Sequence, residues 1–200
     1  MNGERALISV NDTSNEGRQR FSLGHELGHW TCDRSSFRCV SDDIGPQNAE
    51  AKTAEAAANS FASQLVLPDC IVQPWIGRKP ICLDTAAALA RDFRVSLTAA
   101  AIKLVKRAST PACMTCHGQT RLHWFQKNRA FPAEYFIVRE LHAETDAFSA
   151  VFGATSGISR AKREPAMRWL TGPDVFRMSV QTQSVKLPDG SVLTIIAMTR

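Results

Sequence analysis

The stretch "FSLGHELGHW" at residues 21–30 carries two histidines four residues apart, with a glutamate directly after the first. If this stretch is helical, His25 and His29 lie on one face, one turn apart, and both imidazoles can reach a single cation. Glu26 is then rotated by about 100° from His25, which suits a general base beside the metal rather than a ligand. Catalytic zinc usually has three protein ligands, and this segment supplies two of them and a base but not the third.

The remaining positions of this helix predict burial on two sides. Leu23, Leu27 and Trp30 follow an i, i+4, i+7 spacing and point away from the histidines, toward a core. Gly24 and Gly28 flank the histidine face and leave room for another backbone or a ligand. Each glycine costs a helix roughly 1 kcal/mol relative to alanine, so these two predict an offsetting packing or functional role.

The third ligand is not determined by spacing alone. The downstream candidates are Cys32, Cys39, Asp42, Asp43, Glu50 and Glu55. Two of them lie on an alanine-rich helix predicted over 47–66, whose apolar stripe consists of Ala54, Ala58, Phe61 and Leu65. Glu50 lies closer to the middle of that stripe than Glu55 does, so the helical periodicity leaves both open.

Two segments carry a resemblance to a known family. "RFSLGHELGHW" and "EAAANSFASQLVLP" (55–68) resemble the ImmA/IrrE family of metallopeptidases, whose second block reads E-x-x-A-N-x-F-A-x-x-L-x-x-P. The likeness is specific over about residues 7–68 and looser through 89–104. In the last ninety residues only scattered short segments resemble the family.

The resemblance implies a ligand set and an activity. It makes Glu55 the third Zn²⁺ ligand beside His25 and His29, and Glu26 the general base. Asn59, one turn after Glu55, then either holds a ligand from behind or serves helix packing. The implied activity is zinc-dependent endopeptidase cleavage of a protein substrate, by resemblance a helix-turn-helix repressor or antitoxin. Two alternatives stay open: a DNA-binding regulator, and a zinc-dependent binding protein that does not cleave.

The expected fold class is α+β. Residues 1–108 are predicted to form a zincin-like, mostly helical metallopeptidase domain with a short edge strand at "ALISV" (6–10), which an extended substrate could pair with. The helices are expected over 18–32, 47–66, 83–93 and 96–108. Residues 109–200 are predicted to form a small α+β regulatory or partner-binding domain. Its expected elements are a hairpin turning at His117-Gly118, a short helix in "TDAFSAVFG" and a hairpin turning at residues 188–190.

The pair of helices at 84–107 resembles a helix-turn-helix. A recognition helix needs side chains such as Arg, Asn or Gln near its N-terminal end to reach base edges. Here that end carries only short or apolar side chains: Leu97, Thr98, Ala99 and Ala100. Lys103, Lys106 and Arg107 come late and could contact only phosphates. We therefore expect a structural helix pair and no direct nucleic-acid ligand.

Other signals in the second half have ordinary explanations. "CMTCH" (113–117) matches a haem-attachment pattern and could also hold a second zinc ion, but it fits a strand entering a turn. Tyr135 and His123 are candidates for stabilising an oxyanion, without support from spacing. A basic cluster is expected to be a solvated face or to meet an acidic partner surface. Its members are Arg160, Lys162, Arg163 and Arg168.

Composition indicates a globular protein of modest charge. The net charge of +5 does not by itself indicate nucleic-acid binding. No signal sequence and no long apolar segment are visible, so we expect a cytoplasmic protein that does not enter a membrane. In that compartment the six cysteines are expected to stay reduced.

Overall fold

The computed structural model describes residues 7–10, 16–32, 49–153 and 157–198. The chain forms two compact units, one of residues 1–75 with 91–96 and one of residues 76–90 with 97–200. The predicted domain boundary between residues 108 and 109 stays a prediction, because compactness does not test which segments fold independently. No helix in the described ranges combines the length and apolar character that a membrane span requires.

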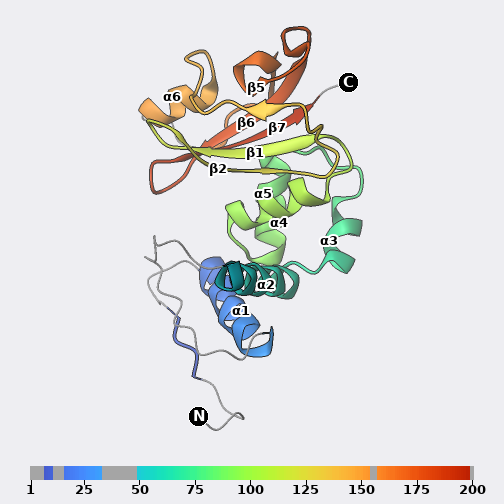
Figure 1. The fold of residues 1–200 in the computed structure, drawn as a ribbon, viewed down its shortest axis with the longest axis vertical. Helices are drawn as coiled ribbons and strands as arrows, with labels where there is room; N and C mark the ends of the chain where they lie inside the picture. Colours follow the sequence, from blue (N-terminus) through green and yellow to red (C-terminus); the bar gives the residue numbers. More distant parts are fainter. Residues whose placement is uncertain (1–6, 11–15, 33–48, 154–156, 199–200) are drawn as a thin grey trace. The chain divides into compact units, whose positions relative to one another are not determined.

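Two helices of the first unit lie close to the predicted ranges, but the predicted core face of the first is wrong, because Leu23 is 49% exposed and Leu27 and Trp30 are only half-buried. Helix α1 runs Glu16–Cys32 and helix α2 runs Ala49–Val66, and the two pack against each other (Figure 1). Helix α3, Asp69–Ile76, was not expected. It begins directly after Pro68, whose carbonyl oxygen accepts the first helical hydrogen bonds, so that proline starts a helix as well as ending the one before it.

Arg20 of α1 joins residues 91–96 to the first unit. Its Nη1 donates hydrogen bonds to the carbonyl oxygens of Phe93 and Arg94, at 2.9 and 3.1 Å. Phe93 is the last residue of a helix and Arg94 follows it; backbone acceptors at a helix C-terminus lack helical partners, and a positive charge is favourable there. One guanidinium therefore holds a segment that is more than seventy residues away in the sequence.

The strand predicted at 6–10 is wrong for the residues that the structure describes. Residues 7–10 have no strand conformation, and the side chain of Leu7 is 95% exposed. The described part of the first unit holds no strand that could pair with this segment, and a strand without a partner leaves its backbone groups unbonded. The edge expected to receive an extended substrate is therefore not formed by these residues.

The second unit is built on a five-stranded antiparallel sheet, so the chain is a mixed α+β protein as predicted. The strand order is β2-β1-β7-β6-β4. The strands are β1 Ala112–His117, β2 Leu122–Lys127, β4 Lys162–Pro165, β6 Ser179–Lys186 and β7 Val192–Met198. Two short strands, β3 Phe136–Ile137 and β5 Leu170–Thr171, form a separate pair. The β1–β2 and β6–β7 hairpins turn where the sequence predicted.

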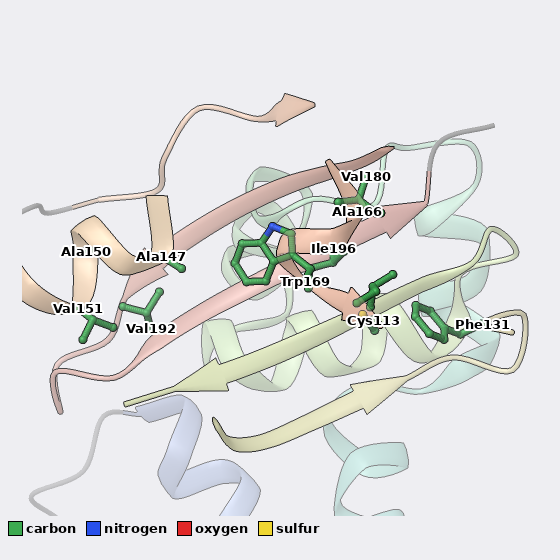
Figure 2. Packing of buried hydrophobic residues seen from close by; sticks show 11 residues of the cluster. Cys113, Phe131, Ala147, Ala150, Val151, Ala166, Trp169, Val180, Val192 and Ile196 are labelled. Atoms are coloured by element: carbon green, nitrogen blue, oxygen red, sulfur yellow. The ribbon is translucent and has the colours of Figure 1, made fainter. Parts of the chain in front are cut away.

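Both faces of this sheet are covered. Helix α5, Leu97–Arg107, contacts β1, β2 and β7, whereas helix α6, Asp146–Phe152, contacts β6 and β7 from the other side (Figure 1). Figure 2 shows the cluster on the α6 side, with Trp169 in its middle. Its fully buried members include Cys113, Ala166, Trp169, Val180, Val192 and Ile196. Burial on both faces explains why β1 is wholly buried instead of alternating.

The helix pair predicted at 84–107 is present, and its second helix serves the core. Helix α4 runs Leu83–Phe93, and Arg94 at the following turn has a positive φ of 51°. On α5, Leu104 and Val105 are fully buried. Lys103, which was expected to be able to reach a phosphate, is only 3% exposed, so it cannot do so here. The burial of these α5 side chains agrees with the prediction of a structural helix pair.

Acid is expected to destabilise the second unit through His117. The ring is fully buried, and burial lowers its pKa from 6.5 to about 4, partly opposed by the backbone of Val138. Between these two pH values the unfolded chain binds a proton that the folded chain excludes. The free energy of unfolding should therefore fall as the pH drops from about 6.5 to 4, by about 3 kcal/mol, and level off below.

Urea unfolding at several pH values measures this dependence. The variant His117→Leu should lose most of it, whereas His142→Gln, at an exposed histidine, should keep it. An unchanged slope in His117→Leu would assign the acid sensitivity to other groups.

Candidate metal centre

Helix α1 presents both histidines of the His-Glu-x-x-His segment on one side. The rings of His25 and His29 meet edge to face, with centroids 4.7 Å apart, and their Nε2 atoms lie 3.1 Å from each other. Two neutral imidazole nitrogens that face each other with their lone pairs repel, so this approach needs a proton or a cation between them. The i, i+4 spacing of a helix is what brings the two rings together.

Helix α2 contributes the third group. Oε2 of Glu55 lies 3.4 Å from Nε2 of His25, and Oε1 lies 3.2 Å from Nε2 of His29. The ligand atoms of these three residues all lie within 4.8 Å of one another. Within the described part of the chain, these residues form a group of side chains that could hold a metal ion. The sequence left the third ligand open, and the structure brings Glu55 to the two histidines.

The donor set fits a zinc ion. Ligand atoms at about 2.0–2.2 Å from a tetrahedral zinc ion lie roughly 3.3–3.6 Å from one another. The observed separations of 3.1, 3.2 and 3.4 Å are close to that range. The side chains of His29, His25 and Glu55 are 7%, 14% and 35% exposed, so solvent reaches the group from the glutamate side. Two imidazoles, one carboxylate and an open side are the parts of a hydrolytic zinc site.

Asn59 lies directly behind one of the histidines. Its Oδ1 is 3.1 Å from Nδ1 of His25, so the amide oxygen can accept the ring N–H. That hydrogen bond favours the tautomer in which Nε2, the atom near Glu55, carries the free lone pair. Nδ1 of His29 is buried without a hydrogen-bond partner in the described residues. A side-chain amide therefore orients the imidazole of His25, whereas Nδ1 of His29 has no such partner among the described residues.

Glycine allows the two helices to come this close. A Cβ added at Gly28 would lie 2.9 Å from Cα of Ala58 and 3.1 Å from its carbonyl oxygen. A Cβ at Gly24 would meet Ala62 at 3.4 Å, an ordinary contact. The sequence predicted that another backbone or a ligand lies close to these glycines. It did not predict that this neighbour is the backbone of Ala58, one turn from Glu55.

Gly28→Ala is expected to lower both stability and zinc affinity. The new methyl group meets backbone atoms that cannot rotate away, so α1 and α2 must separate, at a net cost of about 1–3 kcal/mol. Separation also moves Glu55 away from the histidines. Thermal unfolding and zinc titration measure the two effects.

Gly24→Ala is the matched control for this substitution. Its methyl group has room, so it should be neutral or stabilise the helix by up to about 1 kcal/mol. Equal losses in both variants would mean that glycine flexibility, and not the close crossing, matters.

The other candidate ligands are either not part of this group or not described by the structure. Cys32 is described and exposed, and it is not part of the group. Cys39, Asp42 and Asp43 lie outside the described residues. Glu50 falls within α2, but its side chain is not described. Glu55 is five positions after Glu50, which corresponds to about 140° around the helix, so the two cannot face the histidines together.

Glu26 keeps its predicted place beside the ligand group. It belongs to α1 between the two histidines, is half-buried, and is not a member of the group. Tyr135 and His123 belong to the second unit, and their suggested role in stabilising an oxyanion stays a prediction.

The "CMTCH" segment does not form a second metal site or a haem site. Cys113 pairs with Ile196 and Cys116 pairs with Leu193, so the two cysteines point to opposite faces of the sheet. Burial raises the pKa of Cys113 to about 12 and raises that of Cys116 as well, which disfavours the thiolate that a metal needs. The five cysteines in the described ranges are free.

The predicted basic cluster is largely neutralised within the chain. Lys162 forms an ion pair with Asp146, and Arg168 forms ion pairs with Glu144 and Glu164. Arg163 donates to the hydroxyl of Ser179. A surface that meets an acidic partner would need these charges to be available.

Comparisons with known proteins agree with the helical site. A peptidase family model, M78, described as the IrrE N-terminal-like domain, matches residues 2–105. Among six solved chains that match, one is described as a Mycobacterium tuberculosis transcriptional regulator. It has a TM-score of 0.59 and 14% identity, over 96% of this chain and 74% of that one, which is a likeness of fold. A search of curated proteins finds no match.

Proposed function

This chain belongs to the ImmA/IrrE peptidase family, and we propose on that premise that it is a zinc-dependent endopeptidase. The observation that carries the proposal is the convergence of His25, His29 and Glu55 from two helices, with their ligand atoms within 4.8 Å. Helices α1 and α2 supply these groups, and the half-buried Glu26 of α1 lies beside them.

The residues of this chain have separate roles in the proposed reaction. His25, His29 and Glu55 would hold the zinc ion, which supplies Lewis-acid activation of water and of the scissile carbonyl. Glu26 accepts the proton of the attacking water and passes it to the leaving amine. Asn59 holds the His25 ring in the orientation and tautomer that the ligand set requires. No described residue of the second unit is needed for the proton transfer itself.

We propose a protein substrate in the cytoplasm, specifically a helix-turn-helix repressor or antitoxin. Family resemblance supports this class of substrate, and a structural neighbour of similar fold is described as a transcriptional regulator. The second unit would then regulate access or bind the partner. The buried Lys103 and the core position of α5 speak against direct reading of DNA by the helix pair.

The proposal is tested by cleavage of a candidate repressor. Purified chain loaded with zinc is incubated with a purified helix-turn-helix repressor, and fragments are identified by mass spectrometry. We expect defined fragments that disappear with a chelator and return with added zinc. Zinc-loaded protein that binds the repressor and silences it without fragments would instead support a non-cleaving binding protein. Sequence-specific, salt-dependent duplex binding would support a DNA-binding regulator.

A further inference from the structure

Helix α1 keeps an exposed leucine beside a cavity. The side chain of Leu23 is 49% exposed, although its spacing in the sequence predicted a place in the core. A shallow, open cavity of about 280 Å³ lies at this leucine. Its wall is mostly apolar, and the residues that line it are Val10, Gln19, Arg20 and Leu23. This helix therefore offers apolar surface that an occupant of the cavity would remove from water.

Of the four lining residues only Arg20 is charged, and its charged end is already engaged. Nη1 of Arg20 donates to the carbonyl oxygens of Phe93 and Arg94, at 2.9 and 3.1 Å. Because the guanidinium is held there, the arginine contributes its aliphatic stem to a mostly apolar wall. The cavity therefore favours an apolar occupant over an anion.

The size of the cavity limits what it can hold. Sites for small molecules usually measure about 300–1,000 Å³ and enclose most of the ligand. A cavity of about 280 Å³ with an open side falls below that range. It suits one apolar side chain whose backbone stays outside, such as a leucine or a phenylalanine on a peptide.

The cavity and the metal centre are connected along the surface of α1. Leu23, Glu26 and His29 follow one another at i, i+3 spacing, and residues three apart are neighbours on a helix surface. This row begins at the cavity, passes the proposed base and ends at a proposed zinc ligand. A peptide that lies along the row places one side chain in the cavity while its backbone passes Glu26.

Helix geometry gives the length of peptide that this path requires. Leu23 and His29 are six positions apart, which corresponds to about 9 Å along the helix axis and about 120° around it. On the surface of a helix about 10–12 Å wide, the two positions are roughly 13 Å apart. An extended chain covers that distance with about four residues, at ~3.3 Å each.

We propose that the cavity at Leu23 is a subsite that selects an apolar residue of the substrate, about four residues from the scissile bond. This inference rests on the proposed endopeptidase function and adds a sequence preference to it. Leu23 contacts the substrate but takes no part in proton transfer, so its replacement changes which peptides bind. Zinc stays bound, because Leu23 is not a member of the ligand group.

Cleavage of a peptide library tests the preference. The zinc-loaded full chain is incubated with dodecapeptides of randomised sequence, and mass spectrometry of the products gives the residue frequencies at each distance from the cut. We expect leucine, isoleucine, methionine or phenylalanine to be enriched about three to five residues from the cut, on one side of it. Cleavage without such enrichment overturns the subsite and leaves the endopeptidase function standing. Absence of any cleavage overturns both.

Two glutamine variants separate the cavity from general effects on the helices. Leu23→Gln keeps the approximate size and helix propensity of the side chain but places an amide at the cavity wall. Leu65→Gln is the matched control, at a leucine of α2 that is 53% exposed and does not line the cavity. For a cleaved peptide with the enriched apolar residue, Leu23→Gln should raise KM about tenfold and keep kcat within about twofold. Leu65→Gln should match wild type.

The library experiment repeated with both variants decides the assignment. Leu23→Gln should lose the apolar enrichment, and Leu65→Gln should keep it, at equal zinc content. Unchanged enrichment in Leu23→Gln contradicts contact between the cavity and the substrate. Equal losses in both variants would show that the leucines act through helix packing. Self-association of the wild-type chain in analytical ultracentrifugation that Leu23→Gln abolishes would assign the cavity to a second copy of the chain.

Discussion

Replacing Glu26 with glutamine is expected to abolish cleavage while the chain keeps its zinc. Glutamine has the same size but cannot accept the proton of the attacking water, and loss of a general base typically lowers a rate by about 10²–10⁴-fold. Zinc should stay bound because the three grouped ligand residues do not include Glu26. Initial rates of fragment formation, together with metal analysis of the same preparation, measure both parts.

Glu16→Gln is the control for this experiment. Glu16 lies in the first turn of the same helix and is exposed, so the same chemical change should leave both rate and metal content unaltered. Cleavage at the wild-type rate in Glu26→Gln would assign the base to another residue. Loss of zinc in that variant would show that Glu26 is a ligand.

Local patterns predicted much of this fold because they depend on neighbouring residues only. The i, i+4 spacing of His25 and His29 is a property of any helix, so the pairing of their rings followed from the sequence. The alanine-rich segment and the turns of both hairpins were likewise predictable from residue type. Helix α3 was missed because a proline such as Pro68 usually marks the end of a helix, whereas here another helix begins directly after it.

The third ligand depended on tertiary structure. On an alanine-rich helix nearly every side can pack, so the apolar stripe did not show whether Glu50 or Glu55 faces α1. The choice depends on where the helices cross, and that point is set by Gly28 against the backbone of Ala58. Only the resemblance to the family pointed to Glu55 before the structure was known.

Strand geometry could have settled one alternative from the sequence. Cys113 and Cys116 were considered as ligands of a common ion, yet residues three apart on a strand point to opposite faces. The prediction of a strand there already contradicted a shared site. The contact between the rings of His117 and Trp169, in contrast, could not be foreseen, because Trp169 comes more than fifty residues later in the sequence.

Replacing Glu55 with alanine is expected to remove zinc from the chain. The remaining ligands, His25 and His29, would bind an ion from one helix only, and the half-buried position of Glu55 would be left to water. Altering a residue that only supports a zinc ligand costs about 10–100-fold in metal affinity. The loss of a ligand itself should exceed about 100-fold on that scale. Competition with a chromophoric chelator measures the zinc Kd, and cleavage should fall with it.

Glu50→Ala is the decisive comparison, because it removes the other carboxylate that the sequence left open on the same helix. If Glu55 is the ligand, Glu50→Ala binds zinc as wild type does, since a residue about 140° away on the helix cannot share the ion. Circular dichroism of both variants should show unchanged helix content, because alanine is the best helix former. Full zinc affinity in Glu55→Ala with loss in Glu50→Ala would reverse the assignment. Full affinity in both would mean that neither glutamate is a ligand.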